Sequence, residues 1–328
     1  MRFALSPEQT DFGASVRKLL EAGRTPAAVR SWAAGDTGPG LALVRGLADA
    51  GVLGLAITEE HGGLGAEPVD LLVAFQEIGR AAAPGPLVET AAAIPALLQA
   101  LPDSTAAGEI LPGLAEGALG TIAFGEPLAL DADTAGTVLI ADGPRLSRAT
   151  VGEAVRSVDP ARRLFRVQPG EVLAEGDEVR TAIAAGFDHG ALAAAALLLG
   201  AGKALLNATT EYAKQRKQFG APIGSFQAVK QQLADVLIAL DLAEPLVLRA
   251  ALTTAGPTRA RDVSAALLTS ADAAYRASRV ALQVHGAIGY TAEYDLSLWI
   301  TRVRALQSAW GTADFHRSRI ADALRGTA

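Results

Sequence analysis

The stretch YAKQRKQFGAPIGSFQ at residues 212–227 gives the strongest indication of how this chain folds, because it interrupts a long helical pattern. Apolar residues recur at helical spacing on both sides of it and twice more toward the C-terminus. These runs cover about 188–215, 224–252, 258–285 and 295–325. Glycine-containing connections separate them at 220–224, 256–257 and 286–289. Long helical runs joined by short connections predict an antiparallel four-helix bundle.

The residues before the bundle divide into a helical part and a part rich in strand signals. Ser6, Pro7 and Glu8 form a helix start, with serine as N-cap and proline in the first turn. Further helices are expected at 41–53, 69–80, 90–101 and 109–115. Strands are expected at 121–124, 137–141, 163–167 and within 172–183. We therefore predict a mainly α protein with a helical domain (1–117), a small β domain (118–185) and the bundle (186–328).

Composition excludes several classes of function. The net charge of −6 gives no basic surface for nucleic acid or for an anionic membrane. The absence of cysteine excludes disulfides, thiolate catalysis and zinc–thiolate sites, and no other metal site is expected. The most apolar stretch, 191–206, contains Gly200, Gly202 and Lys203 and is expected to fall short of a membrane span. Without a signal peptide pattern, the expected location is cytoplasmic.

The residues around the first and third connections suit an anionic ligand with a flat ring system. Arg216 offers a planar fork of donors that matches a diphosphate, although an arginine at a helix end can also be an ordinary surface residue. Gly220 and Gly286 allow the backbone to approach a ligand closely. Gln227 and Gln283 can donate hydrogen bonds to phosphate or sugar groups, or else cap helix ends.

The order of these parts and several motifs resemble the acyl-CoA dehydrogenase family over essentially the whole chain. The motifs are EEHGGLG (59–65), EIGR (77–80), the stretch quoted above, QVHGAIGY (283–290) and GT (311–312). The resemblance implies an FAD held across a subunit interface, with part of the site on each chain. The positions that it assigns to cofactor binding are Arg216, Gln218, Phe219, Gln227, Gln283, Gly286, Ala287 and Thr312.

The family's catalytic base is missing from both of the positions where the resemblance would put it. One position precedes the GT motif, where Trp310 stands, and the other lies at the start of the first bundle helix, where Gly190 stands. Neither an indole nor a glycine can remove a proton from substrate, so no catalytic residue is expected. The β region is also short, with only 64 positions between Glu126 and Gly190, and Thr301-Arg302 replaces a motif that usually ends in an acid.

Three functions remain open from the sequence. The first is a non-catalytic subunit that pairs with a full-length, glutamate-bearing acyl-CoA dehydrogenase as an α2β2 tetramer. It resembles short bacterial subunits of this kind, which often act on bulky CoA thioesters such as those of steroid side chains. The second is a self-sufficient enzyme with a relocated base, Asp188 or Glu293, although Asp188 is more simply an N-cap. The third is a flavin-free scaffold of the same fold.

Overall fold

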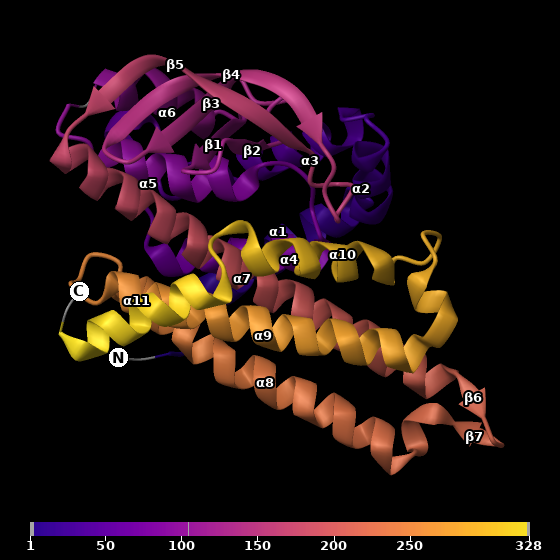
Figure 1. The fold of residues 1–328 in the computed structure, drawn as a ribbon. Helices are drawn as coiled ribbons and strands as arrows, with labels where there is room; N and C mark the ends of the chain where they lie inside the picture. The colour runs from indigo at the N-terminus through magenta and orange to yellow at the C-terminus, as the bar shows by residue number, and fades with distance from the viewer. Residues whose placement is uncertain (1–2, 104, 327–328) are drawn as a thin grey trace.

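The computed structural model describes residues 3–103 and 105–326, which form a helical N-terminal part, a curved sheet and a helical bundle (Figure 1). The N-terminal helices are α1 (Pro7–Ala22), α2 (Thr25–Ala33), α3 (Gly38–Asp49), α4 (Pro68–Ala81), α5 (Ile94–Gln99) and α6 (Thr105–Ala115). The expected start of α1 is confirmed, because the Ser6 hydroxyl accepts from the Gln9 amide and the Gln9 side chain accepts from the Ser6 amide. The helix expected at 41–53 is wrong at its end. Gly51 adopts φ +78° there, and a separate 3₁₀ turn, η1 (Val52–Gly54), follows.

The sheet contains five strands in the order β1-β3-β4-β5-β2. They are β1 (Gly120–Phe124), β2 (Leu128–Leu130), β3 (Thr137–Asp142), β4 (Arg145–Val155) and β5 (Leu164–Glu175). Strands β1 and β3 run parallel, and the other neighbouring pairs run antiparallel. Strands β2 and β4 had no expected counterpart in the sequence. The long arms of β4 and β5 are largely exposed, which hides their period-two pattern.

The bundle begins earlier than expected. Helix α7 runs from Asp177 to Gln215, so the strand expected within 172–183 is wrong beyond the end of β5 at Glu175. Gly176, with φ +136°, makes the change from strand to helix. The interpretation of Asp188 as an N-cap is also wrong, since Asp188 lies three turns inside α7. The division of the chain into domains at residues 117 and 185 remains a prediction.

The rest of the bundle comprises α8 (Gln227–Leu252), α9 (Arg259–His285), α10 (Leu296–Ala309) and α11 (Ala313–Arg325). The single helix expected at 295–325 is therefore divided in two. The break falls at Trp310 and Gly311, where Gly311 has φ +98°. Thr312 then caps the next helix, because its hydroxyl accepts from the Phe315 amide at 3.2 Å. At the break, the Trp310 ring lies against Gly190 of α7.

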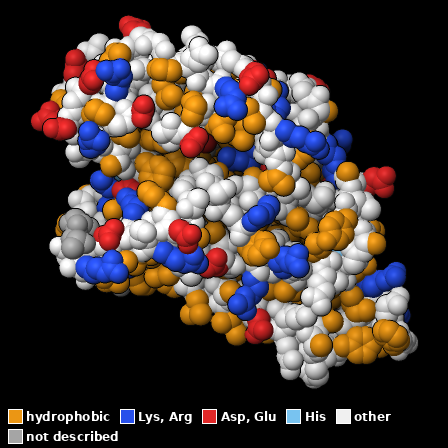
Figure 2. Space-filling view, in the orientation of Figure 1, with side chains coloured by type: hydrophobic (Ala, Val, Ile, Leu, Met, Phe, Trp, Pro, Cys, Tyr) orange, Lys and Arg blue, Asp and Glu red, His pale blue; other side chains and the backbone are white. Residues whose placement is uncertain are grey.

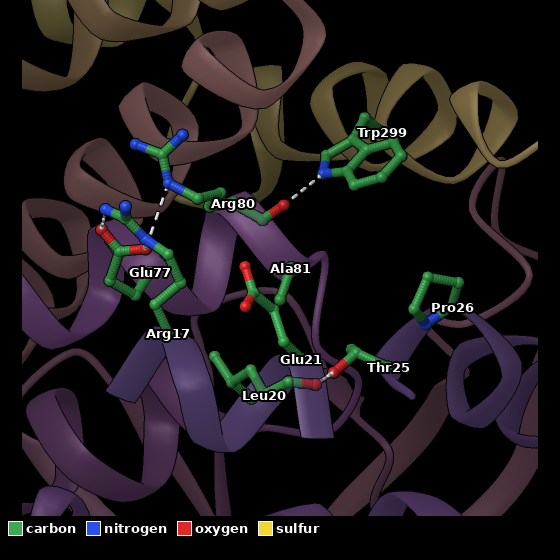
Figure 3. Close-up of a pocket in the computed structure, with 9 residues that line it drawn as sticks. All are labelled: Arg17, Leu20, Glu21, Thr25, Pro26, Glu77, Arg80, Ala81 and Trp299. Carbon is green, nitrogen blue, oxygen red and sulfur yellow. Dashed lines mark hydrogen bonds and ion pairs between the residues drawn. The ribbon is translucent and has the colours of Figure 1, made fainter. Parts of the chain in front are cut away.

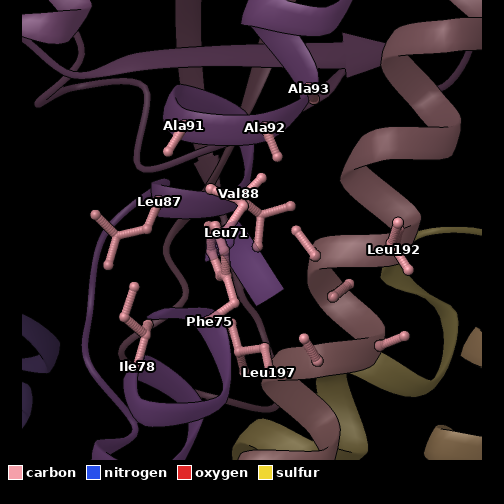
Figure 4. Packing of buried hydrophobic residues seen from close by; sticks show 14 of the residues in the cluster. Leu71, Phe75, Ile78, Leu87, Val88, Ala91, Ala92, Ala93, Leu192 and Leu197 are labelled. Carbon is pink, nitrogen blue, oxygen red and sulfur yellow. The ribbon is translucent and has the colours of Figure 1, made fainter. Parts of the chain in front are cut away.

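Two glycines allow α4 and α7 to pack with their backbones in contact. A Cβ on Gly79 would lie 2.0 Å from the Leu197 carbonyl oxygen, and one on Gly200 would lie 1.9 Å from that of Gln76. Figure 4 shows apolar side chains of α4, including Phe75, beside those of α7 and residues 87–93. An alanine-rich segment with little side-chain bulk thus forms the central helix of the core.

Helix α7 is long and apolar enough to cross a membrane by length and composition, contrary to the expectation for 191–206. Of its most apolar window, however, 78% is buried inside the structure. Its apolar surface is therefore used for packing against the neighbouring helices, as in the core helix of a globular protein.

Candidate functional site

The RKQFG motif forms a short hairpin at one end of the bundle. Its strands are β6 (Lys217–Gln218) and β7 (Ala221–Pro222), and the turn between them contains Phe219 with φ +51° and Gly220 with φ +80°. Two consecutive positive φ values define a tight hairpin turn, and the second is favourable only because the residue is glycine. The Arg216 carbonyl accepts from the Ile223 amide at 2.8 Å and closes the base of the hairpin.

The four predicted cofactor-binding residues of this region are exposed. They are Arg216, Gln218, Phe219 and Gln227. The Phe219 ring is 95% exposed and lies edge-on to Phe226 at 6.2 Å between centroids, so it is not a core residue. No side-chain hydrogen bond to Arg216 is formed within the described part of the chain, which leaves its donors available to a ligand.

A second group of predicted residues lies at the C-terminal end of α9, at the same end of the bundle as the hairpin (Figure 1). Gln283 and Ala287 are exposed, and Gly286 turns the chain with φ +65° and ψ −142°. A Cβ on Gly286 would meet nothing within 4 Å, so the backbone here is open to a ligand. The His285 ring stacks on Tyr212, which precedes the hairpin, at 4.2 Å and 24°. This stack links the C-terminal end of α9 to the residues that precede the hairpin.

Thr312 lies apart from the other predicted residues. The 14 residues of α10 separate it from the η5 turn (Gly286–Tyr290) and its following loop, and such a helix is about 21 Å long. Its hydroxyl already accepts the amide of Phe315. The structure thus groups seven of the eight predicted residues at one end of the bundle and leaves Thr312 at the helix break.

The two positions that lack the base lie in direct contact. A Cβ on Gly190 would lie 2.2 Å from the Trp310 Cζ3 atom and 2.3 Å from its Cη2 atom. The Trp310 indole therefore occupies the space into which any side chain at position 190 would extend. Trp310 itself is only 3% exposed. One bulky ring thus fills the place where either base would stand.

Aromatic rings surround this tryptophan. Phe124 lies 5.7 Å and Phe187 lies 5.9 Å from Trp310 between ring centroids, and Phe315 lies 5.7 Å from Phe187. These residues come from β1, α7 and α11, so the cluster joins the sheet to the bundle. A pocket of about 340 Å³ borders the cluster, with Arg180 and Arg319 among its lining residues. We call Phe124, Phe187, Trp310 and Phe315 the aromatic plug.

A buried polar network holds the backbone of Trp310. The His316 Nε2–H donates to the Trp310 carbonyl at 2.8 Å, and its Nδ1 accepts from the Ser264 hydroxyl at 3.0 Å. Arg319 donates to the same hydroxyl at 3.2 Å and to Asp188 at 2.6 Å. Burial lowers the pKa of His316, which favours the neutral ring that this arrangement requires.

The two carboxylates considered as relocated bases lie in different surroundings. The Asp188 carboxylate is buried and receives Arg319 at 2.6 Å on one oxygen and Arg259 at 2.9 Å on the other. Both oxygens of this buried carboxylate are therefore engaged in ion pairs within the fold. Glu293 lies in an exposed loop, where its carbonyl accepts from Arg30 at 3.3 Å.

Arg302 stands where the family motif ahead of the base position normally ends in an acid, and it makes buried structural contacts. Arg302 is buried, donates to Asp159 at 2.5 Å and donates to the Ala83 carbonyl at 2.8 Å. It therefore ties α10 to the loop between β4 and β5 and to the residues after α4. Its ion pair with Asp159 is buried on both sides.

A second pocket of about 170 Å³ lies between α1, α2, α4 and α10 (Figure 3). Arg17 donates to both carboxylate oxygens of Glu77 at 2.7 and 2.8 Å, and Arg80 donates to the same carboxylate at 3.1 Å. Trp299 donates from its indole nitrogen to the Arg80 carbonyl at 2.9 Å. The Glu77 carboxylate is thus engaged by two arginines, and we assign no ligand to this pocket.

Comparison with known families identifies the fold and the class of protein. Residues 6–118 match the N-terminal domain and residues 179–325 match the C-terminal domain of acyl-CoA dehydrogenases. The acyl-CoA dehydrogenase IpdE2 of Mycobacterium tuberculosis is 36% identical over 88% of each chain. The chain belongs to the acyl-CoA dehydrogenase family, whose members are flavoprotein oxidoreductases that act on acyl-CoA and generally bind FAD.

Solved structures support the same fold. A variant of the Tcur3481-Tcur3483 steroid ACAD superposes with a TM-score of 0.84 at 22% identity, covering 97% of this chain and 98% of that chain. The ChsE4-ChsE5 complex from Mycobacterium tuberculosis gives a TM-score of 0.84 at 22% identity, with full coverage of both chains. The expected mainly α acyl-CoA dehydrogenase fold is confirmed.

Sequence reasoning missed the residues that connect the predicted ones. Phe124, Phe187 and Phe315 lie far apart in the sequence and meet only in the fold. Tyr212 belongs to the quoted motif, and this position is the one signal that could have suggested its stack with His285.

Proposed function

We propose that this chain is the non-catalytic subunit of a heteromeric, FAD-dependent acyl-CoA dehydrogenase. The observation that carries the proposal is the position of the Trp310 ring over Gly190, which fills the place of the base with an indole. A full-length partner subunit would supply the glutamate. The expected assembly is an α2β2 tetramer, and a bulky acyl-CoA such as a steroid side-chain thioester is the proposed substrate.

The exposed end of the bundle fits the diphosphate and adenine side of FAD. Arg216, with free donors, matches a diphosphate in charge and geometry. The open backbone at Gly220 and Gly286 leaves room for phosphate oxygens, since a Cβ there would meet nothing within 4 Å. Gln218, Gln227 and Gln283 add amide donors, and Phe219 adds an exposed ring. When bound, FAD supplies the hydride acceptor for the reaction on the partner.

An exposed apolar surface in the middle of α8 supports a protein partner. Leu237, Ile238 and Leu242 on α8 are 48%, 56% and 67% exposed. Figure 2 shows hydrophobic side chains gathered along the α8 side of the molecule and at its hairpin end. Such a patch on a helix surface is typical of a surface that another protein covers. The contact is proposed to place the hairpin over the partner's cofactor.

The test is the FAD dissociation constant of the complex formed with a full-length acyl-CoA dehydrogenase subunit from the same organism. Loss of a charge-assisted contact costs about 1.5–3 kcal/mol, so Arg216→Ala is expected to weaken FAD binding about 10- to 150-fold. Arg317→Ala is the matched control, because Arg317 is an exposed arginine on α11 whose partner is the exposed Asp314. Equal FAD affinity in both variants would contradict the proposal.

A further inference from the structure

His285 lies at the joint between the two halves of the proposed cofactor surface. It is the last residue of α9 and is only 5% exposed. Its Nδ1–H donates to the Ala281 carbonyl at 2.8 Å, which fixes the plane of the ring. One face stacks on Tyr212 at 4.2 Å and 24°, and Tyr294 lies 5.4 Å away at 52°. The ring is therefore held by one hydrogen bond and two aromatic neighbours.

The residues next to the His285 ring belong to different parts of the proposed cofactor surface. The Tyr212 carbonyl accepts the Arg216 amide at 2.9 Å, which sets where the hairpin begins. Gly286, the residue after His285, makes the open turn. Tyr294 lies in the loop before α10, where Arg30 of α2 pairs with Asp295 at 2.6 Å. The His285 ring thus links the hairpin, the turn and a loop that is anchored to the N-terminal helices.

The ring is suited to a neutral state. The Nε2 atom is buried and accepts no hydrogen bond from the described residues. Burial lowers the pKa of His285, and only the Ala281 carbonyl opposes this effect. The titratable groups around it are the Tyr212 and Tyr294 hydroxyls and, beyond Tyr294, the Asp295 carboxylate that is paired with Arg30. A second proton would have to be carried by Nε2. The resulting N–H would be buried beside two aromatic rings and would have no hydrogen-bond acceptor among the described residues.

We propose that His285, as a neutral imidazole, is a positioning residue that holds the Arg216 hairpin at a fixed distance from the Gly286 turn, so that both can contact one diphosphate. The inference rests on the proposed function of this surface. It assigns His285 no contact with the cofactor. Its effect on binding passes through the stack with Tyr212 and the turn that follows it.

Two variants separate the ring from its hydrogen bond. Asparagine at 285 keeps a donor near the Nδ1 position and removes the ring, whereas phenylalanine keeps the stack and removes the donor and the titration. An aromatic pair contributes about 0.5–1.5 kcal/mol, so His285→Asn is expected to weaken FAD binding by the complex about 3- to 10-fold. His285→Phe is expected to bind FAD within about twofold of the unchanged protein at pH 8.

The pH profile supplies a readout that a general loss of stability would not give. Burial lowers the pKa of His285 below the ordinary histidine range, so FAD affinity is expected to fall only on the acid side of that range, where the ring gains its second proton and the joint weakens. In His285→Phe this decline should be absent. Both dissociation constants are measured with complexes whose unfolding midpoints lie well above the assay temperature.

The outcomes distinguish this inference from the proposed function. If Arg216→Ala weakens FAD binding while His285→Asn leaves it unchanged, the role of His285 is overturned and the cofactor surface stands. If Arg216→Ala also leaves binding unchanged, the proposed function itself fails. An acid-side loss of affinity that persists in His285→Phe would equally overturn the role of the imidazole.

Discussion

The Trp310 ring lies against Gly190, so that the two positions available to a catalytic base in this family occupy one space. The contact joins residues 120 positions apart, from the break after α10 and from the interior of α7. His316 donates a hydrogen bond to the Trp310 carbonyl, and the rings of Phe124 and Phe187 lie beside the indole. The position is therefore closed by packed side chains.

Gly190→Ala should destabilise the protein by about 1–3 kcal/mol, because its Cβ would overlap a ring that is itself enclosed. Gly108→Ala on α6 is the control, since a Cβ there meets nothing within 4 Å and should leave stability equal or raise it by about 0.5–1 kcal/mol. Urea unfolding midpoints measure both.

The same contact predicts coupling between two substitutions. Trp310→Ala alone should cost about 3–5 kcal/mol through the cavity that it leaves. Alanine at 190 should be tolerated in that background, so the double variant should be more stable than the sum of the single effects predicts, by more than about 1 kcal/mol. Additive effects would show that the ring does not occupy this space.

Asp188→Asn should lower stability by about 3–5 kcal/mol, because Arg259 and Arg319 would lose a buried carboxylate. Asp314→Asn on the surface of α11 should change stability by less than about 1 kcal/mol. Turnover per bound flavin in the complex should be equal for the two variants. A selective loss of turnover in Asp188→Asn at unchanged stability would identify it as a base.

Two buried carboxyl groups should make a contribution to stability that falls as the pH rises from about 4 to about 8. Burial raises the pKa of Glu89 to about 7, with Arg162 opposing the shift, and burial raises that of Asp131 to about 6, with its hydrogen bond from Trp32 opposing. A carboxyl group whose pKa is higher in the folded state stabilises the fold while protonated. That contribution is fully present below the unfolded pKa and is lost as the pH passes the folded value.

Glu89→Gln tests this prediction, since glutamine keeps the shape and cannot ionise. The variant should be more stable than the unchanged protein at pH 8, on the order of 3 kcal/mol, because one pKa unit corresponds to about 1.4 kcal/mol. Unfolding midpoints at pH 5 and pH 8 give the comparison. A steeper decline with pH in Glu89→Gln would contradict it.

Local patterns predicted most of the helices and the connection at 220–224, because Ser6 at an N-cap, Gly220 in the connection and apolar periodicity act through neighbouring residues. The same patterns failed where distant contacts decide the structure. The broken fourth helix depends on how Trp310 meets Gly190 and His316. The arginine partners of Asp188 lie 71 and 131 positions away, so the local sequence predicts a helix cap there instead of a buried ion pair.

The candidate site shows the same limit. The sequence identified both substituted base positions and the exposed donors on the hairpin and at the end of α9. It gave no sign that one ring fills both base positions, or that His285 stacks on Tyr212 across 73 positions. Thr312, selected by its motif, lies a full helix away from the other candidates.

The most direct test of the account is the flavin content of this chain purified alone and purified with a full-length acyl-CoA dehydrogenase subunit from the same organism. Absorbance and subunit ratio are measured on both preparations. The account predicts negligible flavin and no dehydrogenase activity for the chain alone, and one FAD per pair of different subunits in an active complex. Stoichiometric FAD together with turnover in the isolated chain would contradict it.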